Sequence, residues 1–282
     1  MNAARILATG AGGQVGAELA RLGVTVVGRD AMDLSDPDTC AAAIRDRAPA
    51  AVVNAAAYTA VDRAENEEAL ATRINGDAPG AMARACADLR IPFVHLSTDY
   101  VFDGEGEAPW EPYDPVDPVN AYGRSKLAGE DAVRDAGGAH VVLRTSWVVS
   151  AHGSNFVKTM LRLGAERDAL SIVADQVGGP TPARDIAGTC VLIADALSRD
   201  PVLAGTYHYA GTPDVSWADF ARAVFDAAGL DCRVTDIPTA DYPTPAARPL
   251  NSRLDCSATR AAFGIARPDW RGGLTRILED LR

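Results

Sequence analysis

The sequence is poor in the residues that build disulfide frameworks and metal centres. It has four dispersed histidines, and its cysteines are odd in number and lack the spacing of metal ligands. We therefore expect no disulfide scaffold and no metal site, but the reduced thiols of a cytoplasmic protein. These cysteines are Cys40, Cys86, Cys190, Cys232 and Cys256.

Positive charge and long apolar runs are also scarce. Lys and Arg number 27 against 38 Asp and Glu, so the formal net charge is −11. A chain this acidic lacks the field that attracts nucleic acids or anionic membranes, so we expect neither as a partner. We also expect no targeting leader and no membrane span, since neither pattern is seen.

What the chain does have is a glycine-rich turn between a strand pattern and a helix pattern. An aliphatic run over 3–9 predicts a strand, and 14–22 has helical character. Gly10 permits the tight turn, Gly13 lets the backbone approach phosphate, and Gly16 lets the helix pack closely on the strand. The helix N-terminus would then attract the pyrophosphate of a dinucleotide. An ordinary glycine-rich loop is the alternative.

Strand patterns alternate with helix patterns along the chain, which is typical of a parallel α/β sheet. We expect a Rossmann-like, doubly wound parallel sheet with a smaller, discontinuous substrate-binding lobe. The expected NAD(P)-binding domain comprises residues 1–150 plus about 183–208. The lobe comprises about 151–182 plus 209–282, because the chain leaves the sheet twice.

The residues after the second predicted strand, 24–27, bear on the choice of cofactor. An acid there binds a ribose 2′-OH and an arginine suits a 2′-phosphate, and this chain has both Arg29 and Asp30. Asp33 and Leu34 could flank the adenine. We favour NADPH and expect NADH to be tolerated.

A tyrosine and a lysine four residues apart form the second motif. Tyr122 and Lys126 share one face of a helix that begins at Asn120, and Thr98 ends the buried strand 91–98. A nearby ammonium would lower the pKa of the phenol, so Tyr122 could donate a proton to a carbonyl as hydride arrives. Lys126 would tune Tyr122 and hold the nicotinamide ribose, while Thr98 binds the substrate oxygen. Alone, this spacing occurs on many helix faces by chance.

These motifs resemble the extended short-chain dehydrogenases/reductases, and within them the family of dTDP-4-dehydrorhamnose reductases, almost from end to end. The glycines and the Tyr/Lys pair mark only the larger group. Segments within 96–102, 143–148 and 247–254 are far more specific to the reductases. The other matching segments are 12–16, 53–62, 120–130, 155–162 and 175–181.

The resemblance implies roles for individual residues. The implied catalytic set is Thr98, Tyr122 and Lys126. The implied cofactor site includes Gly13, Gln14, Val15, Asp33, Leu34, Ala57, Tyr58 and Thr59, to which the motifs above add Gly10, Gly16, Arg29, Tyr122 and Lys126. The implied sugar contacts are Thr98, Asp99, Tyr100 and Trp147.

Four assignments have alternatives that the sequence leaves open. Asn75 could carry a proton relay through water or bind neighbouring backbone. Trp147 could stack on the sugar or thymine, or belong to the core. Arg248, in a proline-rich loop, could bind a nucleotide phosphate or pair with surface acids. The small residues of 54–57 could admit the cofactor or simply pack.

The expected reaction is NAD(P)H-dependent reduction of the C4 keto group of dTDP-4-dehydro-β-L-rhamnose. The alternatives are a reductase or epimerase of another nucleotide sugar, and a non-catalytic nucleotide-binding regulatory subunit. Some relatives pair through a magnesium ion held by carboxylates. Arg184 stands where they can carry an acid, so we expect a monomer or a weak homodimer.

Overall fold

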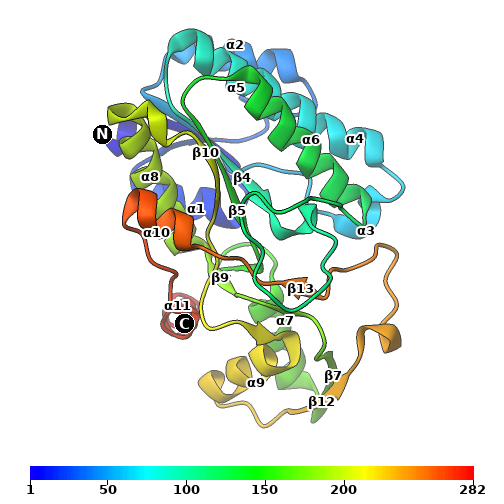
Figure 1. Ribbon diagram of the computed structural model, residues 1–282. Coiled ribbons are helices and arrows are strands. Elements are labelled where there is room, and N and C mark those ends of the chain that lie inside the picture. The colour runs from blue at the N-terminus through cyan, green and yellow to red at the C-terminus, as the bar shows by residue number, and fades with distance from the viewer.

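The computed structural model describes residues 1–282, and its centre is a six-stranded parallel sheet (Figure 1). The strand order is β10-β5-β4-β3-β1-β2, so the chain reverses direction across the sheet between β1 and β3. This confirms the predicted fold class. The strands are β1 (Ile6–Thr9), β2 (Thr25–Val27), β3 (Ala51–Asn54), β4 (Phe93–Thr98), β5 (His140–Thr145) and β10 (Gly205–His208).

Helices cover both faces of this sheet. Strand residues alternate between two cores, as Ile6 and Leu7 illustrate, which explains why the strands are apolar throughout. One core includes helices α1 (Gln14–Arg21) and α8 (Ala183–Arg199). The other includes α2 (Pro37–Arg47) and α5 (Ala78–Leu89), with α6 (Ala121–Ala136) packed beside α5.

Two predicted elements are broken in the structure. The charge run 62–68 is rich in acids that suit the start of one long helix, but the structure forms α3 (Val61–Ala64), α4 (Glu68–Thr72) and the π-helix η2 (Arg73–Asp77) here. Between α3 and α4 the Glu65 carboxylate accepts the Ala121 N–H, which holds this break against α6. The residues 141–149 have a strand-like composition that predicts one continuous strand, but the structure divides them into β5 and β6 (Val148–Val149) at Trp147.

The second lobe lies below the sheet in Figure 1 and has its own apolar core. Its helices α7 and α9 begin at Asn155 and Ser216, whose side chains accept N–H groups of the first turn. The helices are α7 (Phe156–Glu166), α9 (Trp217–Ala228) and α11 (Trp270–Asp280). The short strands are β7 (Ala169–Val173), β8 (Val177–Gly178), β9 (Thr181–Pro182), β11 (Val215–Ser216), β12 (Arg233–Ile237) and β13 (Asn251–Ser252).

Part of the C-terminal stretch returns to the sheet. Helix α10 (Ser257–Phe263) contacts α8 and β10 rather than the core of the second lobe. The remaining turns are the 3₁₀ segments η1 (Ala3–Arg5), η3 (Asp99–Val101), η4 (Pro201–Leu203) and η5 (Thr239–Asp241). None of the helices combines the length and apolar character that crossing a membrane requires.

Candidate active site

A cavity of about 870 Å³ opens at the carboxyl ends of the central strands, where doubly wound sheets bind their ligands. Most residues that the sequence singled out line this one cavity, and Gly16 and Arg248 do not. The lining residues among them are Gly10, Gly13, Gln14, Val15, Arg29, Asp33, Leu34, Ala57, Tyr58, Thr59, Thr98, Asp99, Tyr100, Tyr122, Lys126 and Trp147.

The glycine-rich turn has the geometry that its spacing predicts. Gly10 has a φ of +94°, a conformation that side chains disfavour. A Cβ on Gly16 would lie 1.9 Å from the Gly10 carbonyl oxygen, so only glycine lets α1 approach the turn this closely. Gly13 is the N-cap of α1 and offers no side-chain hydrogen bond, so the first N–H groups of α1, at the cavity-lining Gln14 and Val15, have no capping side chain.

Arg29 and Asp30, the two residues that bear on cofactor choice, follow β2 and differ in their relation to the cavity. Arg29 is exposed and lines the cavity, whereas Asp30 does not line it. Asp33 accepts the Ser35 N–H at 2.9 Å, and the hydrogen bonds from Ser35 hold the pKa of its carboxyl below the ordinary value. The free cation at this position is therefore Arg29, which suits a 2′-phosphate.

Tyr122 and Thr98 meet at the middle of the cavity. Helix α6 begins there because Asn120 accepts the Gly123 N–H at 2.8 Å. A Cβ on Gly123 would lie 2.2 Å from the Tyr100 carbonyl oxygen, so this glycine lets α6 pass against the end of β4. The Thr98 side chain lies beside the Tyr122 phenol, and the Tyr100 ring meets the Tyr122 ring edge-on at 5.5 Å between centroids.

The electrostatics of Tyr122 differ from the sequence expectation. Burial raises the pKa of its phenol to about 12, the neighbouring Thr98 side chain opposes this rise, and the charge of Asp99 adds to it. Lys126 is not among the groups that shift this pKa, and its Nζ donates instead to the Leu96 carbonyl at 2.7 Å. Thr98 is thus the residue that acts directly on the Tyr122 hydroxyl.

Lys126 is a buried cation. Its side chain is 2% exposed, and burial lowers its pKa to about 8, although Glu130 one turn further along α6 acts in the opposite direction. The ordinary pKa of a lysine is about 10.4, so Lys126 can change its charge close to neutral pH. Its Nζ also lies 3.5 Å from Nε2 of His95.

Asp99 supplies a buried carboxylate beside this pair. Its Oδ1 accepts the Thr98 hydroxyl at 3.0 Å. Burial raises its pKa to about 6. Its Oδ2 is buried without a protein partner and belongs to a residue that lines the cavity, so it is a free acceptor for a ligand hydroxyl.

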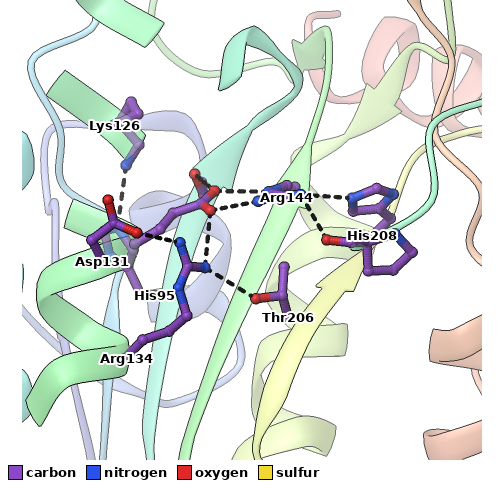
Figure 2. Close-up of polar contacts among 10 residues, drawn as sticks. His95, Lys126, Asp131, Arg134, Arg144, Thr206 and His208 are labelled. Atoms are coloured by element: carbon purple, nitrogen blue, oxygen red, sulfur yellow. Dashed lines mark hydrogen bonds and ion pairs between the residues drawn. The ribbon is translucent and has the colours of Figure 1, made fainter. Parts of the chain in front are cut away.

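A buried ion pair fixes the helix that carries Tyr122 and Lys126. Glu130 of α6 accepts two hydrogen bonds from Arg144 of β5, at 2.8 and 2.6 Å, and one from the Ser97 hydroxyl of β4, at 2.6 Å. Figure 2 shows Arg144 continuing to His208, which lies 3.5 Å from its Nη1, while Arg134 adds a further bond to Glu130. These contacts anchor α6 to three neighbouring strands.

Asn75 and Arg248 both have protein partners in the structure. The Asn75 amide accepts the Tyr58 N–H and donates to the Tyr58 carbonyl and the Ser125 hydroxyl, which fixes the turn that lines the cavity. The Arg248 guanidinium donates to Asp62 at 2.8 Å. A second nitrogen of Arg248 is buried without a partner.

Several residues that line the cavity were not indicated by the sequence, and they come from the second lobe or from the segment of chain that leads into it. Trp217 begins α9 and reaches the cavity from the C-terminal half of the chain. Only its position after the helix cap Ser216 was visible in the sequence, and that position predicts a helix start rather than a ligand contact. The others are Ser146, Val148, Gly153 and Ser154. The protein contains no group of three or more His, Cys, Asp and Glu side chains placed to hold a metal ion.

The strand order, the glycine-rich turn and the Tyr/Lys helix define an extended short-chain dehydrogenase/reductase. Residues 4–282 match the family described as the RmlD substrate binding domain. A dTDP-4-dehydrorhamnose reductase of Burkholderia thailandensis is 48% identical, and the match covers 98% of this chain and 99% of that protein. The chain therefore belongs to the dTDP-4-dehydrorhamnose reductase family, which confirms the resemblance seen in its motifs.

Solved structures agree with this assignment. The crystal structure of a dTDP-4-dehydrorhamnose reductase from Clostridium acetobutylicum has a TM-score of 0.91 at 35% identity, covering 98% of this chain and 99% of that one. The reductase from Bacillus anthracis, solved in complex with NADP, has a TM-score of 0.90 at 33% identity and covers 98% of each chain.

Proposed function

We propose that this enzyme reduces the C4 keto group of dTDP-4-dehydro-β-L-rhamnose to give dTDP-L-rhamnose, with NADPH as the reductant. The observation that carries the proposal is the meeting of Thr98, Tyr122 and Lys126 in the cavity that the glycine-rich turn also lines. Full-length similarity to reductases named for this reaction supports the choice of substrate.

Each residue of the site has its own role in the proposed reduction. When bound, NADPH supplies a hydride to the carbonyl carbon of the sugar. Tyr122 donates its proton to the carbonyl oxygen, so that the C=O becomes a CH–OH group, and Thr98 orients both oxygens through its hydroxyl. Lys126 holds the nicotinamide ribose and returns a proton to Tyr122. Asp99, Tyr100 and Trp147 hold the sugar in the remaining part of the cavity.

The cofactor-binding groups favour NADPH and tolerate NADH. Gly10, Gly13 and the N-terminus of α1 would hold the pyrophosphate, and Arg29 would meet a 2′-phosphate. The NADP complex of the Bacillus anthracis relative supports this preference. We place the reaction in the cytoplasm, and we expect a monomer or a weak homodimer, which sedimentation analysis would distinguish.

The test is a coupled reduction followed by the near-ultraviolet absorbance of NADPH. The substrate would be made in situ from dTDP-glucose by a dehydratase and an epimerase. We expect a decay that requires every component and that Tyr122→Phe abolishes while NADPH binding persists. Tyr113→Phe is the matched control, because Tyr113 is 84% exposed and does not line the cavity.

Other outcomes would redirect the proposal. Absence of decay with NADPH and NADH, despite demonstrated substrate, would point to another nucleotide sugar. Stoichiometric NAD⁺ retained through purification, without net consumption of NADPH, would indicate an epimerase. Silence in every assay combined with tight binding to a partner enzyme would indicate a regulatory subunit.

A further inference from the structure

A chain of buried polar groups leads from the glycine-rich turn to Lys126. The Thr9 hydroxyl donates to Asn54 Oδ1 at 2.6 Å, and Asn54 Nδ2 lies 3.0 Å from Nδ1 of His95. Nε2 of His95 faces Lys126 Nζ at 3.5 Å, a contact that Figure 2 draws. Thr9, Asn54 and His95 are each at most 1% exposed, so the chain is shielded from solvent.

The donors and acceptors among these buried polar groups determine which nitrogen of His95 carries the proton. Asn54 Oδ1 accepts from the Thr9 hydroxyl and from the Ala56 N–H, so its amide nitrogen faces His95 as a donor. Nδ1 of His95 must therefore accept, and the neutral ring carries its proton on Nε2. That N–H points at Lys126 Nζ.

His208 provides a contrast within the same sheet. Its Nδ1 faces the Trp110 carbonyl at 3.0 Å and must donate, so its Nε2 is an acceptor for Arg144 Nη1. His208 thus offers an acceptor to its neighbouring cation, as is usual. His95 offers a donor instead. A donor repels an ammonium group but forms a hydrogen bond with a neutral amine.

The His95 ring stays neutral in this environment. Burial, together with the charge of Lys126, holds the pKa of its ring well below the ordinary value. The close approach of α6 is permitted by Gly129, whose added Cβ would lie 3.5 Å from His95 Nε2 and 2.0 Å from the Asn75 carbonyl oxygen. The contact is thus built into the packing of helix on strand.

We propose that His95 is a positioning residue that presents an N–H to Lys126 Nζ and so favours the uncharged, proton-accepting form of this lysine. The proposal rests on the proposed function, in which Lys126 returns a proton to Tyr122 after each reduction. A lysine that stayed charged throughout could hold the ribose but could not accept the next proton from solvent.

The other groups around Lys126 do not account for an uncharged form. Glu130 on α6 favours the ammonium, and its carboxylate is already bound by Arg144 of β5 and Arg134. Tyr122 on α6 is neutral below a pKa of about 12. The charged residues of η2, Arg73 and Asp77, are exposed. The remaining polar neighbour is His95 on β4, whose Nε2 lies 3.5 Å from Lys126 Nζ.

The test compares His95→Gln with His208→Gln as the matched control. Glutamine at position 95 can turn its carbonyl oxygen toward Lys126 and accept from the ammonium. We expect a basic limb of the kcat/KM profile near pH 8 in the wild type, from Lys126, and we expect it to move upward by about one pH unit in His95→Gln, a tenfold change in the protonation equilibrium. His208→Gln should leave that limb in place, although it can lower the melting temperature.

A binding measurement separates this proposal from the choice of substrate. NADPH fluorescence titrations across pH need no turnover, and the midpoint of their pH dependence should move upward in His95→Gln and not in His208→Gln. His95→Phe, which removes both nitrogens, should move it in the same direction. A folded His95→Gln protein whose binding midpoint and basic limb match those of the wild type would overturn the proposal. A shifted binding midpoint without sugar reduction would retain it and refute only the proposed substrate.

Discussion

The indole rings of Trp147 and Trp217 stack face to face, with centroids 3.5 Å apart and planes 7° apart. Trp147 follows the central strand β5 and Trp217 begins α9, and both line the cavity, so the stack joins the end of the sheet to the second lobe. Trp147 adopts a φ of +48°, which is costly for a large side chain. Trp217 is held in turn by its indole N–H, which donates to Gln176 at 3.1 Å.

This pair predicts a defect in substrate binding when Trp217 is truncated. Trp217→Ala removes the partner that holds the strained Trp147 ring, so we expect KM for the sugar nucleotide to rise by roughly tenfold, since such pairs contribute about 0.5–1.5 kcal/mol beyond burial. The exciton signal of stacked indoles in the far-ultraviolet circular dichroism should disappear as well. Trp217→Phe retains an aromatic face and should recover most of the affinity. An unchanged KM in the alanine variant would show that the stack is only structural.

The same residue shows what could be predicted from the sequence and what could not. Gly10, Tyr122 and Lys126 act within single strand–turn–helix units, and local spacing therefore revealed them. Trp217 reaches the cavity only because the chain leaves the sheet and returns with another lobe, a relationship that no local pattern records. His95 lies within an apolar strand whose pattern predicts burial but not its contact with Lys126.

The fold likewise has features that local sequence patterns predicted and features that depend on distant contacts. Alternation of apolar strands and helices predicted the parallel sheet, because both faces are covered by helices. The break at Trp147 was not predicted, since Ser146 and Trp147 continue a strand-like composition and their departure depends on packing against Gly178 and Trp217. The interrupted helix after Val61 depends likewise on a distant partner, the Ala121 N–H that Glu65 binds.

The glycine-rich turn offers a matched pair of substitutions. Gly16→Ala places a Cβ 1.9 Å from the Gly10 carbonyl oxygen, so α1 must move away from the turn. We expect a loss of about 1–3 kcal/mol in the free energy of unfolding, together with weaker NADPH binding. Gly12→Ala adds a Cβ that meets nothing within 4 Å and should leave stability nearly unchanged. Equal melting temperatures for the two variants would contradict the role given to Gly16.

The buried pair of Glu130 and Arg144 predicts a large effect on stability. Glu130→Gln leaves the Arg144 guanidinium without its counter-charge in a buried position, and we expect a loss of about 3–5 kcal/mol by chemical denaturation. Arg134→Gln, which removes the half-exposed partner of the same carboxylate, should cost much less. A loss no larger in Glu130→Gln than in Arg134→Gln would mean that the buried pair does not anchor α6.

The pH dependence of stability should show the same pair. Burial raises the pKa of Glu130, but the hydrogen bonds and charge of Arg144 outweigh burial and hold that pKa below its ordinary value. The unfolded chain therefore binds this proton more readily, and the pair stabilises the fold above the ordinary glutamate pKa. Stability should fall as the pH falls through that range, and the Glu130→Gln variant should lack this part of the decline.

Cofactor preference should depend on Arg29. If the exposed guanidinium meets the 2′-phosphate, Arg29→Ala should raise KM for NADPH by roughly tenfold, about 1.4 kcal/mol, and leave KM for NADH nearly unchanged. The effect should shrink at high salt, because an exposed charge pair is screened. Parallel changes with both cofactors would remove Arg29 from the choice between them.

Asp99 predicts how sugar binding responds to acid. Burial raises the pKa of its carboxyl to about 6, and its unpartnered Oδ2 is the free acceptor in the cavity. Above pH 6 the carboxylate can accept a sugar hydroxyl, and below it the protonated group loses that acceptor strength. We therefore expect KM for the sugar nucleotide to rise as the pH falls through about 6, with a smaller change in KM for NADPH.

The variant Asp99→Asn isolates this group. Its amide has no titrating proton, so KM should be raised at neutral pH and should no longer change near pH 6, while Asp117→Asn, at an exposed position, should behave as the wild type. The pH dependence of stability provides an independent check, because deprotonation of Asp99 should strengthen sugar binding but destabilise the fold. The folded protein holds the Asp99 proton more tightly than the unfolded chain, so this group makes the fold less stable as the pH rises from about 4 to about 6. If Asp99→Asn kept the wild-type pH dependence of KM, another group would have to bind the sugar hydroxyl.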